Sequence, residues 1–219
     1  METLLLKIVS IVYKYIIFAI MEEKKAEIIE RTTMVYMRNG IKSVTMDDLA
    51  RELGISKKTI YKHFEDKDHL VCSIIENKIK MEKEMCNNCT TASENALEEM
   101  LAVSKSVVEN IGNINPSVFY DLQKYHIDAW KIIDEHKWNF VLQMMIENIK
   151  RGIDENIYRS DLNFEIIGRQ YVVATDMIMN HEIYPWPTFK IDELFEEVMR
   201  FQLNGMVNEN GRKILNKAL

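Results

Sequence analysis

The chain has 219 residues, 47% of them hydrophobic, which is enough to bury the core of one domain or of two small ones. It contains 7 glycines and 3 prolines, too few for an all-β fold with many turns, so the composition favours helices. The formal charge of −6 argues against general binding of polyanions.

Charge is unevenly distributed along the chain. Residues 22–82 hold equal numbers of basic and acidic side chains, so the acidic excess belongs to residues 83–219. Between Ser56 and Phe64 lysines occur without any acidic residue. A local basic surface is therefore compatible with the acidic total.

Residues 1–21, "METLLLKIVSIVYKYIIFAIM", form an apolar N-terminal extension. Lys7 and Lys14 divide it into pieces shorter than the ~20 apolar residues of a membrane span, and no small-residue cleavage site follows it. We interpret it as a misassigned upstream start, with Met21 as the natural beginning. A membrane anchor formed by residues 1–20 is the alternative.

The first predicted helix spans residues 22–39 and ends at Gly40. Its inward face is expected to comprise Ile28, Ile29, Thr32, Val35 and Tyr36, which recur at helical spacing.

Three further helices begin at capping residues. Thr45 with Asp48 makes a capping pattern before "MDDLAREL", which Gly54 interrupts. Ser56 can cap the short helix "KKTIYKHF". Asp66 can cap a helix that runs from Lys67 towards Met85, for which the predicted inward residues are Leu70, Ile74, Met81 and Met85.

A polar segment, "NNCTTASEN", follows, and after it we expect four or five longer helices. They are placed near residues 94–111, 116–134, 136–155, 163–181 and 190–207. The fold class is therefore all-α.

Three cysteines, Cys72, Cys86 and Cys89, without a secretory signal suggest a reducing, cytoplasmic location. Cys86 and Cys89 form a C-x-x-C pair, but it lacks the second pair or nearby histidines of a zinc site and the βαβ context of a redox site. We interpret them as thiols at a frayed helix end, with a redox or metal role as the alternative. No cofactor or metal is expected.

Two short helices joined through "ELGIS" form a helix-turn-helix pattern, in which Gly54 permits the tight turn and the second helix can enter a DNA major groove. Ile60 and Phe64 are four residues apart and are expected to face the core. The outward residues are then Lys57, Lys58, Thr59, Tyr61, Lys62 and His63, which can meet phosphates and base edges. An ordinary solvated face is the competing interpretation.

Residues 22–82 resemble the DNA-binding domain of TetR-type transcriptional regulators. The matching residues are Gly40, Val44, Thr45, "DLARELGIS", "TIYKHF" and "DKDHL". The resemblance implies contacts with operator DNA by Thr45, Lys57, Thr59, Tyr61, His63 and Lys67. Lys58 departs from the small residue often found there and would add a contact of its own.

The resemblance further implies that residues 83–219 are a helical domain with a small-molecule effector cavity, and that the last two long helices form a homodimer. Two segments, "IIGRQYVVATDMIM" and "IDELFEEVMRFQLNGM", have the broad apolar faces such an interface needs. The expected effector site is the aromatic-rich segment 118–145, with candidate residues Phe119, Tyr125, His126, Trp130, Trp138 and Met144.

These observations predict a DNA-binding repressor that is released from double-stranded operator DNA by an unidentified effector, although an activator is also compatible. One alternative is a helical membrane-associated adaptor. The other is an enzyme, for which no Ser-His-Asp, H-E-x-x-H or G-x-S-x-G pattern is found in the sequence.

Overall fold

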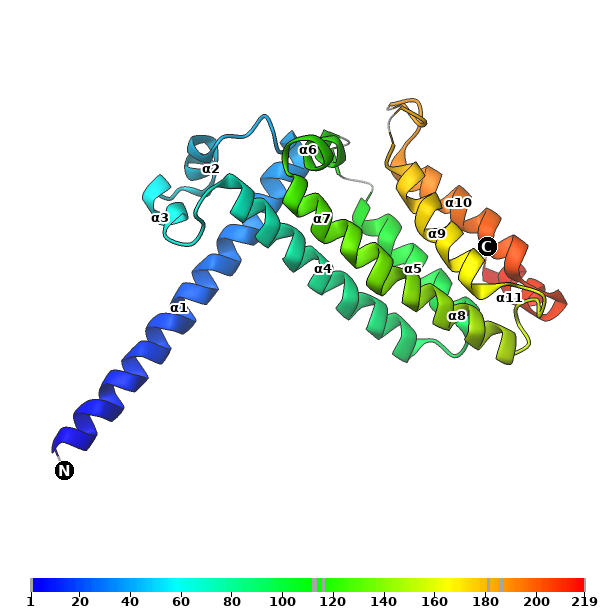
Figure 1. The fold of residues 1–219 in the computed structure, drawn as a ribbon, viewed down its shortest axis with the longest axis horizontal. Coiled ribbons are helices and arrows are strands. Elements are labelled where there is room, and N and C mark those ends of the chain that lie inside the picture. Colours follow the sequence, from blue (N-terminus) through cyan, green and yellow to red (C-terminus); the bar gives the residue numbers. More distant parts are fainter. Residues whose placement is uncertain (1, 112–113, 116, 181, 186, 219) are drawn as a thin grey trace.

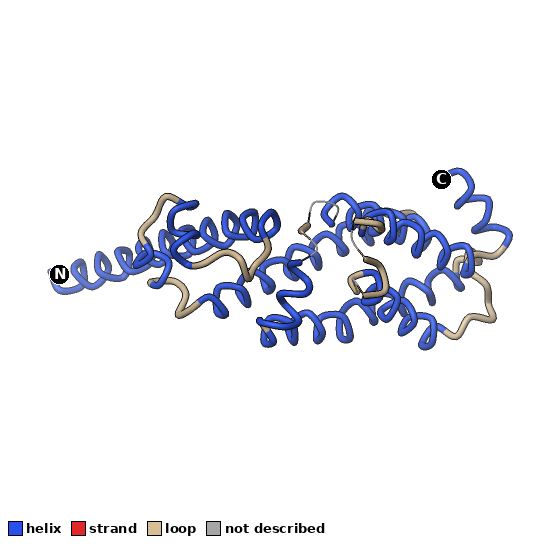
Figure 2. Tube along the Cα trace, turned by 90° about the horizontal axis from the view of Figure 1, so that it is seen from above, coloured by secondary structure: helices blue, strands red, loops and turns tan. Residues whose placement is uncertain are grey.

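The computed structural model describes residues 2–111, 114–115, 117–180, 182–185 and 187–218. Within these ranges the chain forms helices and no strand, which confirms the all-α class. Tyr158 and Val207 make an isolated antiparallel bridge. The molecule is elongated, with α2 and α3 near one end and α9, α10 and α11 towards the other (Figures 1 and 2).

The helices of the N-terminal half are α1 (Glu2–Asn39), α2 (Met46–Leu53), α3 (Lys57–Tyr61), α4 (Lys67–Ala92) and α5 (Ala96–Ile111). Those of the C-terminal half are α6 (Ser117–Tyr125), α7 (Ile127–His136), the π-helix η1 (Lys137–Val141), α8 (Leu142–Asp154), α9 (Phe164–Ile178), α10 (Ile191–Met206) and α11 (Glu209–Ala218).

Helix α1 ends at Asn39 as predicted, but it begins at Glu2 rather than at residue 22. No glycine or proline interrupts residues 2–39, so the apolar extension continues the same helix. Figure 1 shows this first part of α1 projecting from the rest of the structure. In the part of the chain that the structure describes, no helix is long and apolar enough to cross a membrane.

The predicted caps are confirmed. Thr45 and Asp48 form a reciprocal capping box at the start of α2, which ends at Gly54 in the left-handed conformation, with φ of 68°. The side chain of Ser56 accepts a hydrogen bond from the backbone of Thr59, and that of Asp66 from the backbone of His69. Local side-chain chemistry thus sets where α2, α3 and α4 begin.

Helix α4 continues beyond the predicted end near Met85 and includes most of the polar segment. Cys86 and Cys89 are therefore not at a frayed helix end, and Cys86 is only 3% exposed. Burial raises the pKa of the Cys86 thiol to about 12. Met81, which was expected to face inward, is 55% exposed because the buried stripe of α4 passes on another side.

The C-terminal helices differ from the prediction in two places. The helix expected over residues 116–134 is divided into α6 and α7 at His126, whose φ and ψ of −127° and 61° are not helical. Helix α11, which follows Val207, was not predicted. The other predicted helices, near 94–111, 136–155, 163–181 and 190–207, occur with shifted ends.

Two hydrophobic cores lie along the molecule. The N-terminal core joins α1 to α4 with Val118, Leu122 and Ala129 of α6 and α7. The C-terminal core comprises residues from α5 and α8 to α11. Helix α4 is continuous across residue 82, and the N-terminal core also takes in residues of α6 and α7 from the C-terminal half.

Candidate functional site

The helix-turn-helix is built as the sequence predicts. Ile60 and Phe64 are 0% and 1% exposed, and they pack against buried Leu49 and Leu53 of α2 and against α1. Burial of this face fixes the rotation of α3 about its axis, so the opposite face points to solvent. The molecule therefore presents α3 at its surface, as a recognition helix requires.

The outward face of α3 is basic. Lys57, Lys58, Tyr61 and Lys62 are exposed, and Tyr61 keeps 43% of its surface accessible. Lys57 is the one of these whose ammonium meets an acid, since its Nζ lies 3.0 Å from Asp47 Oδ2 of α2. That hydrogen bond raises the pKa of Lys57, so its positive charge is secure at any physiological pH.

Two of the predicted contact residues, Thr45 and Thr59, carry structural hydrogen bonds as well. The Thr45 hydroxyl accepts from the backbone of Asp48 and donates to its carboxylate at 2.6 Å. The Thr59 hydroxyl lies 2.8 Å from Ser56 Oγ. His63 is half-buried beside the Phe64 ring. The hydroxyls of Thr45 and Thr59 are positioned by the caps of α2 and α3, which leaves them fewer free donors for DNA than the exposed lysines have.

Lys67 differs from the other predicted contacts because its ammonium is directed into the protein. Its Nζ donates to the carbonyl oxygens of Ile41 and Val44 at 2.6 and 2.7 Å. Partial burial lowers the pKa of Lys67. An ammonium has three donors, so one remains for a phosphate while two hold the turn between α1 and α2.

That same turn is attached to α6. The carboxylate of Asp121, 5% exposed, accepts hydrogen bonds from the backbone amides of Ile41 and Lys42 at 3.0 and 2.8 Å. Gly40 has a φ of 81°, and a Cβ there would lie 2.5 Å from the Ser117 hydroxyl at the start of α6. The backbone before α2 thus rests directly on α6.

A second contact joins the α6–α7 boundary to α4. Buried His126 Nδ1 lies 2.5 Å from Asp68 Oδ1 in the first turn of α4. Tyr125, the residue before it, accepts a hydrogen bond from Lys42 Nζ at 2.7 Å. Together with Asp121, these contacts form the α6 joint, which links the helix-turn-helix to the C-terminal half.

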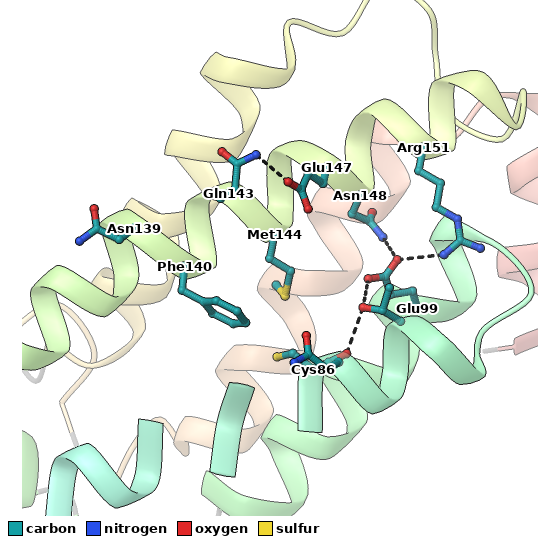
Figure 3. A pocket seen from close by; sticks show the side chains of 11 residues that line it. Cys86, Glu99, Asn139, Phe140, Gln143, Met144, Glu147, Asn148 and Arg151 are labelled. Carbon is teal, nitrogen blue, oxygen red and sulfur yellow. Dashed lines mark hydrogen bonds and ion pairs between the residues drawn. The ribbon is translucent and has the colours of Figure 1, made fainter. Parts of the chain in front are cut away.

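A cavity of about 430 Å³ lies between α4, α5 and the segment formed by η1 and α8 (Figure 3). Figure 3 shows Phe140 and Met144 pointing from η1 and α8 towards Cys86 of α4. The lining residues are Cys86, Asn87, Thr90, Glu99, Asn139, Phe140, Gln143, Met144, Glu147, Asn148 and Arg151. This size and mixture of groups suit a small organic molecule.

Polar groups gather at one end of the cavity around Glu99, which is 4% exposed. Its carboxylate accepts hydrogen bonds from Thr90 Oγ1 at 2.6 Å, from Asn148 Nδ2 at 2.9 Å and from Arg151 at 3.3 Å. Sequence reasoning missed this cluster. A charged residue between Leu97 and Met100, on the buried side of α5, was the signal that could have revealed it.

Of the six residues suggested for an effector pocket, Met144 alone lines this cavity. Trp138 and Tyr125 are 37% and 38% exposed, and Tyr125 and His126 belong to the α6 joint. Trp130 packs against the N-terminal core, and Phe119 is half-buried on α6. The cavity thus uses the end of the aromatic-rich segment, through Phe140 and Met144, together with α4, α5 and α8.

Residues 28–74 match the family model described as "Bacterial regulatory proteins, tetR family". The helix-turn-helix domain of this chain is of the TetR type. The match covers α2, α3 and the parts of α1 and α4 that pack on them. The predicted TetR-type resemblance is confirmed, and the match lies within residues 22–82.

Similarity to curated transcriptional regulators extends beyond that domain. The HTH-type transcriptional regulator YvaF of Bacillus subtilis (strain 168) is 28% identical over 171 residues, 75% of this chain and 86% of the relative. The HTH-type transcriptional repressor KstR2 of Mycobacterium tuberculosis is 18% identical over 85% of this chain and 94% of its own. The domain match and these relatives support a DNA-binding transcriptional regulator, and neither alternative class is supported.

Solved structures show the same fold over most of this chain. A TetR-family regulator from Agrobacterium tumefaciens superposes with a TM-score of 0.70 at 14% identity, over 86% of this chain and all of the other. The ketosteroid transcriptional regulator KstR2 of Mycobacterium tuberculosis gives 0.56 at 16% identity, over 85% and 96% of the two chains. The helical C-terminal half is thus part of the shared fold.

Proposed function

We propose that the protein is a homodimeric repressor that binds operator DNA through α3 and is released when a small molecule occupies the cavity. The observation that carries this proposal is the basic face of α3, held outward by the burial of Ile60 and Phe64. An acidic chain that gathers lysines on one exposed helix has a surface suited to a specific DNA site.

The proposed DNA contacts are Thr45, Lys57, Lys58, Thr59, Tyr61, Lys62, His63 and Lys67. The exposed lysines would neutralise phosphates, and Tyr61 would reach base edges or sugars. The test is fluorescence anisotropy with DNA from upstream of the protein's own gene, measured over a range of salt concentrations. We expect affinity to fall steeply with salt for every sequence and to exceed that for unrelated DNA. Equal affinity for all sequences would contradict a specific operator.

The proposed dimer interface is the outer face of α9 and α10. Ile166, Val173 and Phe201 are 63%, 47% and 79% exposed, although they lie on helices with buried inner faces. Tyr171, Ile178 and Leu203, also expected at the interface, are instead buried in the chain's own C-terminal core. A two-fold partner would cover the exposed residues and place two α3 helices symmetrically, about 34 Å apart on DNA.

Phe201→Glu combined with Ile166→Glu tests this interface, and Lys131→Glu on α7 is a control for added negative charge. We expect the double variant to sediment as a monomer at micromolar concentration and to lose specific DNA binding, while the control stays dimeric. A monomeric wild type would contradict the proposal.

Release would pass through the α6 joint. Phe140 of η1 lines the cavity. The π-helix η1 continues directly from α7, which follows α6 after the break at His126. A ligand that favours a different placement of these helices would move the backbone before α2, which Asp121 holds. Because such coupling is reciprocal, operator DNA must weaken ligand binding by the same factor. The free thiols of all three cysteines fit action in a reducing cytoplasm.

A further inference from the structure

The charges around the cavity are mainly acidic. Glu99 and Glu147 line it, and Arg151 is the one basic residue among the lining side chains. Arg151 is already engaged, since its Nε donates to Glu155 at 2.6 Å and a terminal nitrogen lies 3.3 Å from Glu99. Two carboxylates therefore surround the guanidinium, which leaves little positive charge to attract an anion.

The acidic groups retain capacity for a new donor. A carboxylate offers about four acceptor positions, and Glu99 uses three of them for Thr90, Asn148 and Arg151. Glu147 lies at the exposed side of the cavity, where its Oε1 accepts from Gln143 at 2.8 Å. A ligand with a positive or hydrogen-bond-donating group would thus find an acceptor both at the buried end of the cavity, at Glu99, and at its exposed side, at Glu147.

The apolar part of the cavity is also suited to a cation. Phe140 and Met144 point into it from η1 and α8 (Figure 3). Lys83 Nζ already lies 5.3 Å from the centroid of the Phe140 ring, a distance at which the ring attracts positive charge. Lys83 is exposed at the surface, so it contributes a mobile positive charge beside the cavity rather than a fixed anion site.

We propose that the cavity binds a cationic amphiphile, with its apolar part against Phe140 and Met144 and its positive group near Glu99 and Glu147, and that it discriminates against anionic amphiphiles. This proposal rests on the role of the cavity as the effector site. It adds the charge of the ligand, which the position of the cavity alone does not indicate.

The test uses three probes with the same chain: decyltrimethylammonium, decanol and decanoate, each below its micelle concentration. Calorimetric titration of the full-length protein should give a Kd for the cation at least about tenfold below that for decanoate, with decanol between them. Glu147→Gln should reduce the difference between the Kd for the cation and the Kd for decanoate. Glu109→Gln, at the distant end of α5, should leave it unchanged.

Met144→Trp should abolish binding of the cation by filling the cavity, which separates cavity binding from adsorption to an acidic surface. Decanoate that binds as tightly as the cation would overturn the proposal. So would cation binding that survives Met144→Trp, or no binding of the cation at all.

Adding each probe to the complex with upstream DNA separates this proposal from the function. If decanoate releases the DNA and the cation does not, the protein is still an effector-controlled regulator, but the proposed positive charge of the ligand is refuted. Cation bound in the cavity without DNA release would support the ligand class and contradict the proposed release.

Discussion

The buried carboxylate of Asp121 provides a direct test of how α6 supports the helix-turn-helix. It accepts two backbone hydrogen bonds, from Ile41 at 3.0 Å and Lys42 at 2.8 Å, and is 5% exposed. Asp121→Ala would remove both bonds and leave the buried amide of Ile41 and the partly buried amide of Lys42 without this acceptor. Bonds to a charged group contribute about 1.5–3 kcal/mol each, so the expected loss of stability is about 3–6 kcal/mol.

A loss of that size is a large share of the roughly 5–15 kcal/mol that stabilises a typical domain. It corresponds to a fall in Tm of about 10 °C for a chain of this length. Asp121→Asn keeps an oxygen in the same place, and neutral bonds are about half as strong, so we expect about half the effect. Urea denaturation followed by circular dichroism measures the difference.

Asp128→Ala is the matched control, because that carboxylate lies on the adjacent helix α7, is 80% exposed and pairs only across one turn with Lys131. We expect the Asp128→Ala variant to be as stable as the wild type. If Asp121→Ala unfolds at the same urea concentration as the wild type, the turn before α2 does not depend on α6, and the proposed route of release loses its basis.

Three further predictions concern α3, α2 and α8. Tyr61→Ala should abolish tight DNA binding in anisotropy while leaving helicity and sedimentation unchanged, and a variant that unfolds would show that Tyr61 supports the core. Hydrogen bonds to Thr45 lower the pKa of Asp48 to about 2 from 3.8, so its stabilising effect is present above pH of about 4 and is lost as pH falls towards about 2. Asp48→Asn should accordingly flatten the loss of stability between those pH values in acid titrations, and an unaltered profile would exclude the capping box as its cause. Gly152→Ala would place a Cβ 2.1 Å from the buried Tyr158 ring, and should cost about 2–3 kcal/mol in urea denaturation, whereas an unchanged midpoint would mean that the ring can move freely.

The sequence was sufficient where interactions are local. The capping box of Thr45 and Asp48, the caps at Ser56 and Asp66 and the left-handed Gly54 each act within a few residues. The spacing of Ile60 and Phe64 likewise fixed which face of α3 is buried. These short-range rules determined the helix-turn-helix and the outward lysines, because the period of a helix leaves no other face for them.

Tertiary structure decided the features that depend on distant residues. The break at His126 coincides with a contact to Asp68, 58 residues away, and the ammonium of Lys67 turns inward to carbonyl groups on the loop before α2. The cavity likewise needs α4, α5 and α8 to meet, and its lining includes Glu99 and Phe140, which were not among the candidates that the sequence suggested. Composition shows that a segment can bury aromatic surface, but the packing angles of its helices determine which side chains line a space between them.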